Sequence, residues 1–343
     1  MNPIDHLTTT QDASAPLGVL LTNVGTPASP TAKDVRPYLA QFLGDRRIID
    51  LPKWIWYPIL YGIILVTRPK RSAKLYENVW TNEGSPLLVI LRRQAAGIQA
   101  LLDQRLDVPV RVEVGMSYGS PSVADGLRAL QTAGAKRILV LPLYPQYSTT
   151  TTAATFDAVF AEVKRWRWMP EVRTVHGYHD DEAYLAALET TIREQWQTHG
   201  RAERLLFSYH GIPKSYSDRG EPYFEQCHRT SELLAEHMGL ADDEWFVTFQ
   251  SRFGPIEWLK PYTDHSLEEW GAAGAAGVAS VDAVCPGFSA DCLETIDEIG
   301  REAAESFLEA GGQNFNYIPA LNDRPDHLSM LADIVERNLQ GWI

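Results

Sequence analysis

The feature that most constrains the fold is a regular alternation of two kinds of segment along the chain of 343 residues. Short runs rich in β-branched residues predict strands, and longer amphipathic stretches between them predict helices. The predicted strands are Gly18–Val24, Val110–Met116, Arg137–Leu143, Val172–His176, Leu205–Tyr209, Trp245–Gln250, Val278–Val284 and Phe315–Pro319. The predicted helices between them include Pro86–Leu106, Ala153–Trp166, Glu182–Thr198, Tyr223–Met238 and Ala290–Leu308. Alternation on this scale predicts an α/β protein with parallel sheets flanked by helices.

Three short motifs occur in the same order in both halves of the chain. The first, LLTNVGTP at 20–27, is matched by LFSYHGIP at 206–213. SYGSP at 117–121 is then matched by RFGP at 252–255, and YPQYS at 144–148 is matched by CPGFS at 285–289. A repeated order of this kind indicates a duplicated unit. We therefore predict two similar Rossmann-like domains, each a parallel sheet flanked by helices, with a cleft between them.

The same patterns place the domain boundaries. Residues 1–15, MNPIDHLTTTQDASA, precede the first apolar run, and we expect them to form a disordered tail. They contain no basic cluster followed by an apolar run, so no signal peptide is expected. The N-terminal domain is predicted at 16–180 and the C-terminal domain at 181–324.

The composition excludes one class of partner and indicates a compartment. The chain has 44 acidic and 31 basic residues and a net charge of −13. This balance argues against nucleic acid as a partner, because phosphate binding needs a basic surface. The three cysteines, Cys227, Cys285 and Cys292, are odd in number and form no CxxC pair, so we expect a reducing cytoplasm.

One stretch, WIWYPILYGIILV at 54–66, is unusually apolar. It is too short to span a bilayer, which needs about 20 residues, so it is either a buried core segment or an exposed lip. Gly25 and Gly119 are 94 positions apart, whereas the matching Gly211 and Gly254 are 43 apart, so the first half contains an insertion that includes this stretch. Because an insertion need not be core, we expect an apolar lip at the mouth of the cleft.

A histidine lies at the end of one predicted strand. In RLLFSYHGIP, 204–213, the apolar run ends at His210, and Gly211 and Pro213 then terminate the strand. Ligand-binding groups of α/β proteins gather at the carboxyl ends of strands. The imidazole could therefore accept a proton or bind a metal, although a histidine at such a position is also commonly structural.

A row of carboxylates follows another strand of the same domain. Glu294, Glu298, Glu302 and Glu305 are spaced by four, four and three residues, which puts them on one face of a helix. Glu302 and Glu305 fit a solvated surface, whereas Glu294 lies close to the sheet edge that carries His210. An imidazole and a carboxylate together predict an open site for a divalent metal such as Fe(II), Zn(II) or Co(II).

Aromatic residues surround these positions. They fit a hydrophobic core, but together with the apolar lip they also fit a flat hydrophobic ligand. They are Tyr144, Tyr147, Tyr209, Tyr223, Phe253, Trp258, Tyr262 and Phe288.

Several longer motifs identify a family. The C-terminal half contains FSYHGIP, GEPYFEQC, TFQSRFGPIEWLKPYTD and CPGFSADCLETIDEI, and the N-terminal half contains NVGTP, FLGDRRIIDLP and LYPQYSTTTT. These motifs resemble those of the ferrochelatases, which insert Fe(II) into a porphyrin to make heme. The form CPGFSADCLET resembles enzymes of Gram-negative bacteria. The resemblance implies a two-domain chelatase-type fold with a porphyrin cleft, and a C-terminal helix, 325–343, that packs back on the first domain.

The resemblance also implies residue roles. It makes His210 and Glu294 catalytic residues and metal contacts, and Glu298 a further catalytic carboxylate. The expected porphyrin contacts are Val24, Tyr144, Tyr147, Tyr209, Phe288, Trp54 and Ile59. Metallation removes two pyrrole N–H protons as the cation enters, which an imidazole and carboxylates can support.

Three positions depart from the pattern of the family. Cys292 stands where animal relatives have histidine, and Glu221 replaces the aspartate of a GDPY motif. Val24 occupies a cleft position that other branches fill with Met or Tyr.

The expected reaction is insertion of Fe(II) into protoporphyrin IX to give protoheme and two protons, the terminal step of heme biosynthesis. The alternatives are coproporphyrin or another tetrapyrrole as substrate, and a non-catalytic carrier of tetrapyrrole or metal. We expect no permanently bound cofactor and no [2Fe–2S] cluster, because such a cluster needs four ligands and the chain has three cysteines. We expect a cytoplasmic protein whose apolar lip docks transiently on the inner face of the cell membrane.

Overall fold

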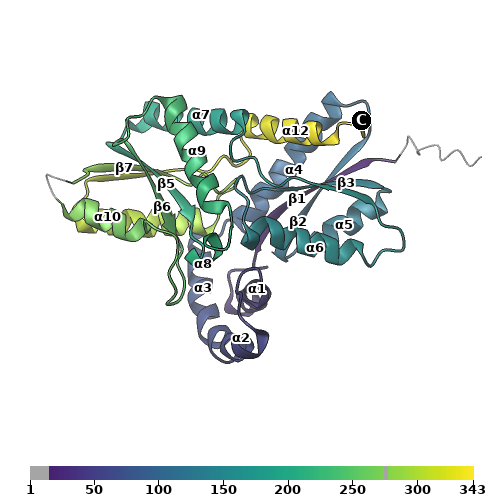
Figure 1. Ribbon diagram of the computed structural model, residues 1–343, viewed down its shortest axis with the longest axis horizontal. Helices are drawn as coiled ribbons and strands as arrows, with labels where there is room; N and C mark the ends of the chain where they lie inside the picture. Colours follow the sequence, from purple (N-terminus) through teal and green to yellow (C-terminus); the bar gives the residue numbers. More distant parts are fainter. Residues whose placement is uncertain (1–14, 274–276) are drawn as a thin grey trace, which may run out of the picture.

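Two parallel four-stranded sheets form the centre of the molecule (Figure 1). The computed structural model describes residues 15–273 and 277–343, so the tail predicted at 1–15 lies outside the described residues except for its last position. The strand orders are β2-β1-β3-β4 and β6-β5-β7-β8, which are the same order in the two halves. This confirms the duplicated α/β unit predicted from the repeated motifs.

All of the predicted strands are present, with ends that differ by at most three residues. The first sheet contains β1 Leu17–Thr26, β2 Val110–Gly119, β3 Arg137–Pro142 and β4 Glu171–Thr174. The second contains β5 Arg204–His210, β6 Trp245–Gln250, β7 Ser280–Val284 and β8 Asn314–Ile318. In each sheet the first strand lies in the interior and pairs with two neighbours. His210 is therefore at the carboxyl end of an interior strand.

Helices cover both sheets. The α-helices are α1 Ala32–Gly44, α2 Lys53–Ile59, α3 Leu65–Val79, α4 Pro86–Arg105, α5 Val123–Thr132, α6 Ala154–Val163, α7 Glu182–His199, α8 Lys214–Ser217, α9 Tyr223–Met238, α10 Thr263–Ala272, α11 Ala304–Ala310 and α12 Pro325–Leu339. Within residues 15–273 and 277–343, three segments are π-helical, η1 Leu60–Ile64, η2 Thr149–Ala153 and η4 Glu294–Ala303.

The helix predicted at Ala290–Leu308 differs from the prediction, because it begins later and its first ten residues are the π-helix η4. Asp291 is held outside the helix by the loop after β8. Its backbone N–H donates to Asn322 Oδ1 at 2.8 Å, and its carboxylate accepts from Asn322 Nδ2 at 2.7 Å. These two hydrogen bonds tie Asp291 to the loop after β8, and the regular helix begins only at Glu294.

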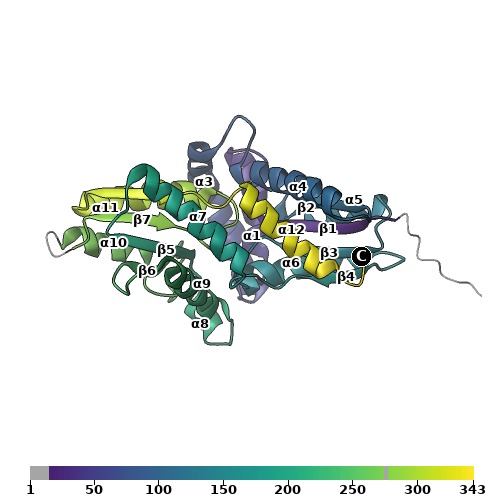
Figure 2. The ribbon, with the colours of Figure 1, turned by 90° about the horizontal axis from the view of Figure 1, so that it is seen from above.

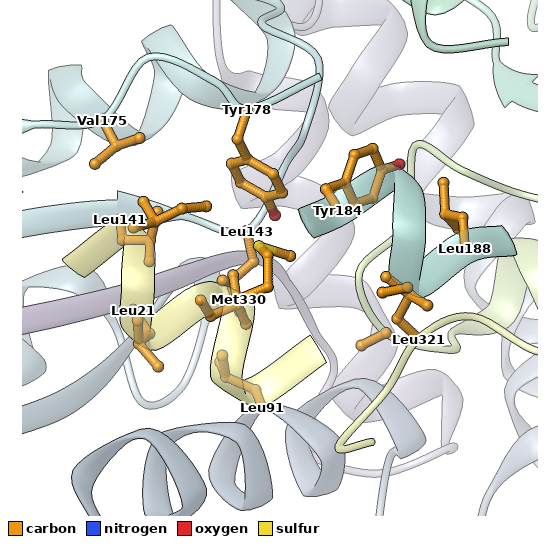
Figure 3. Close-up of a cluster of buried hydrophobic side chains, with 14 of the residues drawn as sticks. Leu21, Leu91, Leu141, Leu143, Val175, Tyr178, Tyr184, Leu188, Leu321 and Met330 are labelled. Carbon is orange, nitrogen blue, oxygen red and sulfur yellow. The ribbon is translucent and has the colours of Figure 1, made fainter. Parts of the chain in front are cut away.

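One continuous hydrophobic core joins the two halves. Figures 1 and 2 show α7 and α12 next to each other along one surface, α7 against the second sheet and α12 against the first. Figure 3 shows Met330 of α12 in this core, close to Leu143 of the first half, with Tyr184 of α7 in the same cluster. The two sheets are thus held together by shared apolar packing.

The apolar segment 54–66 lies in a lobe formed by α1, α2 and α3, which extends below the sheets in Figure 1. Its buried side chains, Trp56, Leu60 and Leu65, pack in a separate cluster with α1. Its exposed apolar side chains are Trp54, Ile55, Ile59, Tyr61, Ile63 and Val66. Trp54 is 78% exposed and Ile63 is 59% exposed, so the segment is not a buried core segment. Within the described residues, no helix is both long and apolar enough to cross a membrane.

Candidate active site

His210 is the last residue of β5 and is half-buried. Its Nδ1 lies 2.7 Å from the carbonyl oxygen of Gly211, and because a carbonyl can only accept, Nδ1 carries the hydrogen. The neutral imidazole therefore leaves Nε2 without a proton. Glycine is needed at 211, since a Cβ there would lie 2.8 Å from the carbonyl oxygen of Gln250. The strand end thus presents a basic nitrogen in a defined orientation.

Glu298 lies in η4 and is held by the end of β6. Its carboxylate accepts from the Ser251 backbone N–H at 2.7 Å and from Ser251 Oγ at 2.5 Å. Burial raises the pKa of Glu298, and the charge of Glu294 raises it as well. The hydrogen bonds from Ser251 and the charge of protonated His210 act in the opposite direction. Glu298 is therefore within electrostatic range of both predicted catalytic partners.

Glu294 brings the two halves of the chain together. Burial raises the pKa of Tyr38 in α1 and of Tyr76 in α3, and the negative charge of Glu294 raises both further. Leu293, next in the chain, packs against the apolar cluster of the same lobe. The carboxylate of Glu294 is therefore within electrostatic range of two tyrosines of the first half.

The outer acids of the same helix have other partners. Arg301 donates to Glu302 at 3.0 Å and to Glu305 at 3.3 Å. Both carboxylates are more than half exposed. This is the solvated surface expected for Glu302 and Glu305. Arg301 also pairs with the buried Asp297 at 2.7 Å, so its charge lies between the inner and outer carboxylates.

No closed metal cage is formed by these residues. Throughout 15–273 and 277–343, no group of three or more His, Cys, Asp or Glu side chains could hold a metal ion. Two cavities of about 250 and 240 Å³ are lined by other residues, one by Arg92 and Arg93 of α4 and one by Lys214, Trp258 and Lys260. The predicted cleft between the domains therefore stays a prediction.

The predicted porphyrin contacts lie in different surroundings. Val24 and Phe288 are partly buried at the margins of the core, and Tyr147 stacks on His176 with ring centroids 5.4 Å apart. Tyr144 is buried, and its hydroxyl has no partner among the described residues. Trp54 and Ile59, in α2, are exposed.

Tyr209 needs a correction as a porphyrin contact. Its side chain is fully buried, and its hydroxyl is 2.9 Å from Ser231 Oγ of α9. Neighbouring residues of a strand point to opposite faces of the sheet. Tyr209 therefore points away from His210 and into the core, where its side chain has no exposed surface for a ligand.

Glu221, which departs from the family pattern, forms a polar bridge between the halves. Its buried carboxylate accepts from Ser148 Oγ at 2.5 Å and from the Thr149 N–H at 2.7 Å, and the Thr149 hydroxyl also donates to it. Glu221 precedes α9 and Ser148 follows β3. The bridge therefore joins the loop at the carboxyl end of β3 to the second half.

Some residues at the site were missed in the sequence. Gln250 is the last residue of β6, paired with His210, and Ser251 follows it. The signal for both was available, since they lie at the carboxyl end of a strand adjacent to β5. Tyr38 and Tyr76 lie more than 200 positions from Glu294 in the chain. No local pattern in the sequence indicates that they meet it.

With this geometry in place, comparison with known proteins identifies the family. The family model described as ferrochelatase matches residues 16–339. The chain belongs to the ferrochelatase family. A ferrochelatase of Thioalkalivibrio sulfidiphilus is 58% identical over 95% of this chain and 88% of its own length. One from Nitrosococcus oceani is 51% identical over 96% and 89%, and ferrochelatase 1 of Shewanella oneidensis is 50% identical over 96% and 98%.

Solved structures show the fold. The sirohydrochlorin chelatase SirB from Bacillus subtilis, in complex with cobalt, has a TM-score of 0.53 at 12% identity and covers 94% of this chain and 95% of its own. The siroheme enzyme CbiX has a TM-score of 0.50 at 13% identity, with 95% and 100% covered. The predicted two-domain chelatase fold is confirmed.

Membership of the family establishes the reaction. The protein inserts Fe(II) into protoporphyrin to form heme, and it is a lyase of heme biosynthesis with iron and porphyrin as substrates. These relatives do not favour coproporphyrin or another tetrapyrrole as the substrate.

Proposed function

We propose that His210, Glu294 and Glu298 carry the metallation step. The observation that supports this most is the hydrogen bond from His210 Nδ1 to the Gly211 carbonyl oxygen, which leaves Nε2 as a base near two carboxylates. A neutral imidazole accepts a proton near pH 7, and carboxylates take up protons or a divalent cation. Fe(II) would contact His210 and Glu294, and its other ligands would come from the porphyrin nitrogens or water.

The two pyrrole protons set the task of these residues. A base close to the macrocycle accepts each proton as the N–H bond breaks, and the electron pair stays on the nitrogen that binds the metal. We propose His210 Nε2, at the strand end, for this role. Glu298 is suited to accept that proton next, because its raised pKa lies closer to neutral pH than that of an ordinary carboxylate.

The porphyrin is proposed to lie at the strand ends of the first half, with the apolar lobe at one side. Its proposed contacts are Val24, Tyr144, Tyr147, Phe288, Trp54 and Ile59. We propose that residues 16–180 and the C-terminal helix 325–343 form the first domain, and that residues 181–324 form the second. The packing of α12 on α4 and β3 supports assigning the C-terminal helix to the first domain.

The exposed apolar face of 54–66 is proposed to dock transiently on the inner face of the cell membrane, in an otherwise cytoplasmic protein. Its exposed aromatic and aliphatic residues fit the boundary between headgroups and acyl chains. Porphyrin and heme are poorly soluble in water, so contact with lipid would help loading and release. We propose no nucleic-acid partner, in keeping with the net charge of −13.

No permanently bound cofactor is part of the proposal. The three cysteines are buried free thiols, and burial raises the pKa of each. A raised pKa disfavours the thiolate form that binds iron. A [2Fe–2S] cluster is therefore not proposed.

The visible spectrum tests the substrate assignment. The purified protein is incubated anaerobically with Fe(II) and either protoporphyrin IX or coproporphyrin, and conversion of the porphyrin bands is followed with time. We expect catalytic turnover with protoporphyrin. Faster turnover with coproporphyrin would replace the substrate, and stoichiometric binding without turnover would indicate a carrier.

A further inference from the structure

Ser251 has an unusual backbone conformation directly after β6. Its φ is 64°, in the left-handed region, and Asn322 is the other non-glycine residue with positive φ in the part of the chain that the structure describes. This region is unfavourable for a residue that has a Cβ, because the Cβ comes too close to the neighbouring carbonyl oxygen. Such a conformation persists where surrounding contacts hold it, and it often marks a functional site.

In this conformation, the backbone N–H and the hydroxyl of Ser251 both donate to the carboxylate of Glu298. The backbone N–H of Ser251 donates to Glu298 Oε1 at 2.7 Å, and its hydroxyl donates to Oε2 at 2.5 Å. Both oxygens of Glu298 are therefore held, which fixes the plane of the carboxylate as well as its position.

The preceding residue connects this pair to the rest of the site. Gln250 is buried, and its Nε2 donates to the backbone oxygen of Glu294 at 2.9 Å and lies 3.4 Å from Glu298 Oε2. Its carbonyl oxygen accepts from the Gly211 N–H at 2.8 Å. Gln250 and Ser251 thus link the strand end of His210 to the helix that carries both carboxylates.

We propose that Ser251 is a positioning residue for Glu298 in metallation. The amide N–H fixes Oε1, and the hydroxyl serves Oε2 in both protonation states, because a hydroxyl both donates and accepts. When a proton released from the porphyrin binds Oε2, an O–H bond forms there and Ser251 Oγ changes from donor to acceptor. When the proton leaves for water, that O–H bond breaks and the hydroxyl donates again.

This inference rests on the catalytic role proposed for Glu298, and the test separates the two. The variants are Ser251→Gly, Ser251→Ala and Glu298→Gln, with the double variants of Ser251 and Glu298. Both single substitutions at 251 remove the hydroxyl and keep the N–H. Glycine relaxes the left-handed backbone, and alanine keeps it strained. Ser217→Gly, in the neighbouring α8, is the control and should keep wild-type turnover.

Removing one hydrogen bond to a charged group is expected to lower kcat about tenfold in both Ser251 variants. The KM for porphyrin should stay within about twofold, because Ser251 is not proposed to touch the macrocycle. In the Glu298→Gln background, loss of the Ser251 hydroxyl should have no further effect on kcat, since the residue acts through Glu298.

A loss in only one of the two Ser251 variants would assign the effect to the backbone and overturn the proposal. Equal losses that persist in the Glu298→Gln background would also overturn it. If Glu298→Gln loses turnover while both Ser251 variants keep it, the positioning role is wrong and the role of Glu298 stands. If Glu298→Gln keeps wild-type turnover, the role of Glu298 is wrong and the positioning role fails with it.

Discussion

At the scale of single residues, His210 allows the most direct test of the site. His210→Ala should abolish metallation while porphyrin affinity stays within about tenfold, because one imidazole contributes little to the burial of a large flat ring but supplies the base at the strand end. Turnover is followed by loss of the porphyrin bands, and affinity by fluorescence quenching without metal. A variant that kept more than a tenth of the turnover would exclude His210 as the essential base.

The carboxylates of η4 are expected to differ with their surroundings. Glu294→Gln should lower turnover strongly, because Glu294 is the carboxylate proposed to contact Fe(II), and its charge reaches the buried Tyr38 and Tyr76. Glu302→Gln, the matched control eight residues further along the same helix, should change turnover less than twofold, since Glu302 is exposed and paired with Arg301. Initial rates at saturating porphyrin and Fe(II) compare the two. Equal effects would show that the inner and outer acids are not distinct.

How far the sequence predicts a residue depends on where its partners lie in the chain. The strand end at His210 and the acidic helix face are local patterns, so both were predictable. The prediction of Tyr209 as a porphyrin contact was wrong. The rule that corrects it is also local, because side chains alternate along a strand. Ser251 and Tyr76 act through contacts with distant segments, and a single sequence contains no record of such contacts.

At the scale of elements, the apolar segment 54–66 is amphipathic, and its two faces should respond differently to substitution. Replacing Trp54, Ile63 and Val66 by Ser removes exposed apolar surface, so it should raise the KM for porphyrin presented in lipid vesicles and weaken vesicle binding. Thermal stability should hardly change. Flotation of the protein with vesicles and a melting curve measure the two effects.

The buried face of the same segment supplies the control. Leu60→Ala should destabilise the protein by about 2–5 kcal/mol, because Leu60 is fully buried against α1 and its loss leaves a cavity. If the Ser variants instead lost stability and kept their vesicle binding, the exposed face would be structural and the docking proposal would be wrong.

Helix η4 shows what a periodic pattern cannot specify. Spacings of four, four and three predict a helix with one acidic face, and this face was identified. They do not distinguish an α-helix from a π-helix, because residues four apart share a face in both. The late start at Glu294 accompanies hydrogen bonds between Asp291 and Asn322, which lie in separate loops 31 positions apart. π-Helical turns are rare, and those that occur often lie at functional sites.

At the scale of the whole molecule, the repeated motifs predicted both sheets, because each half contains a complete local pattern of strands and helices. The single core that joins them was not predictable in the same way. It depends on α7 and α12 packing across the junction, and amphipathic helices of this kind fit many surfaces.

The whole purified protein should also contain no iron–sulfur cluster. A [2Fe–2S] cluster needs four ligands, normally thiolates, and the three cysteines are buried and free. The protein before addition of substrate should be colourless and silent in electron paramagnetic resonance after dithionite reduction. Stoichiometric acid-labile sulfide, or a brown protein as isolated, would contradict this expectation.

The junction between the halves should also set how the protein responds to acid. His327 of α12 is fully buried, and its Nδ1 donates to the Asn322 carbonyl oxygen at 2.7 Å. Burial lowers its pKa to about 4, although the hydrogen bond to Asn322 and the charge of Asp326 oppose the shift. Arg324, also nearby, lowers it further. The imidazole of His327 therefore has a lower pKa in the folded protein than in the unfolded chain, and it stays neutral to a lower pH.

The sign of the pH dependence follows from this difference. Above an ordinary histidine pKa of about 6.5, His327 is neutral in both states and has no effect on stability. As the pH falls from about 6.5 to about 4, the unfolded chain takes up a proton that the folded protein excludes, which disfavours folding by roughly 3 kcal/mol at the end of that window. His327→Gln, which keeps a side-chain donor for Asn322, removes this titration. Calorimetric melting temperatures should therefore fall more steeply between pH 6.5 and 4 in the wild type than in His327→Gln, and parallel curves would exclude His327 as the acid-sensitive group of the junction.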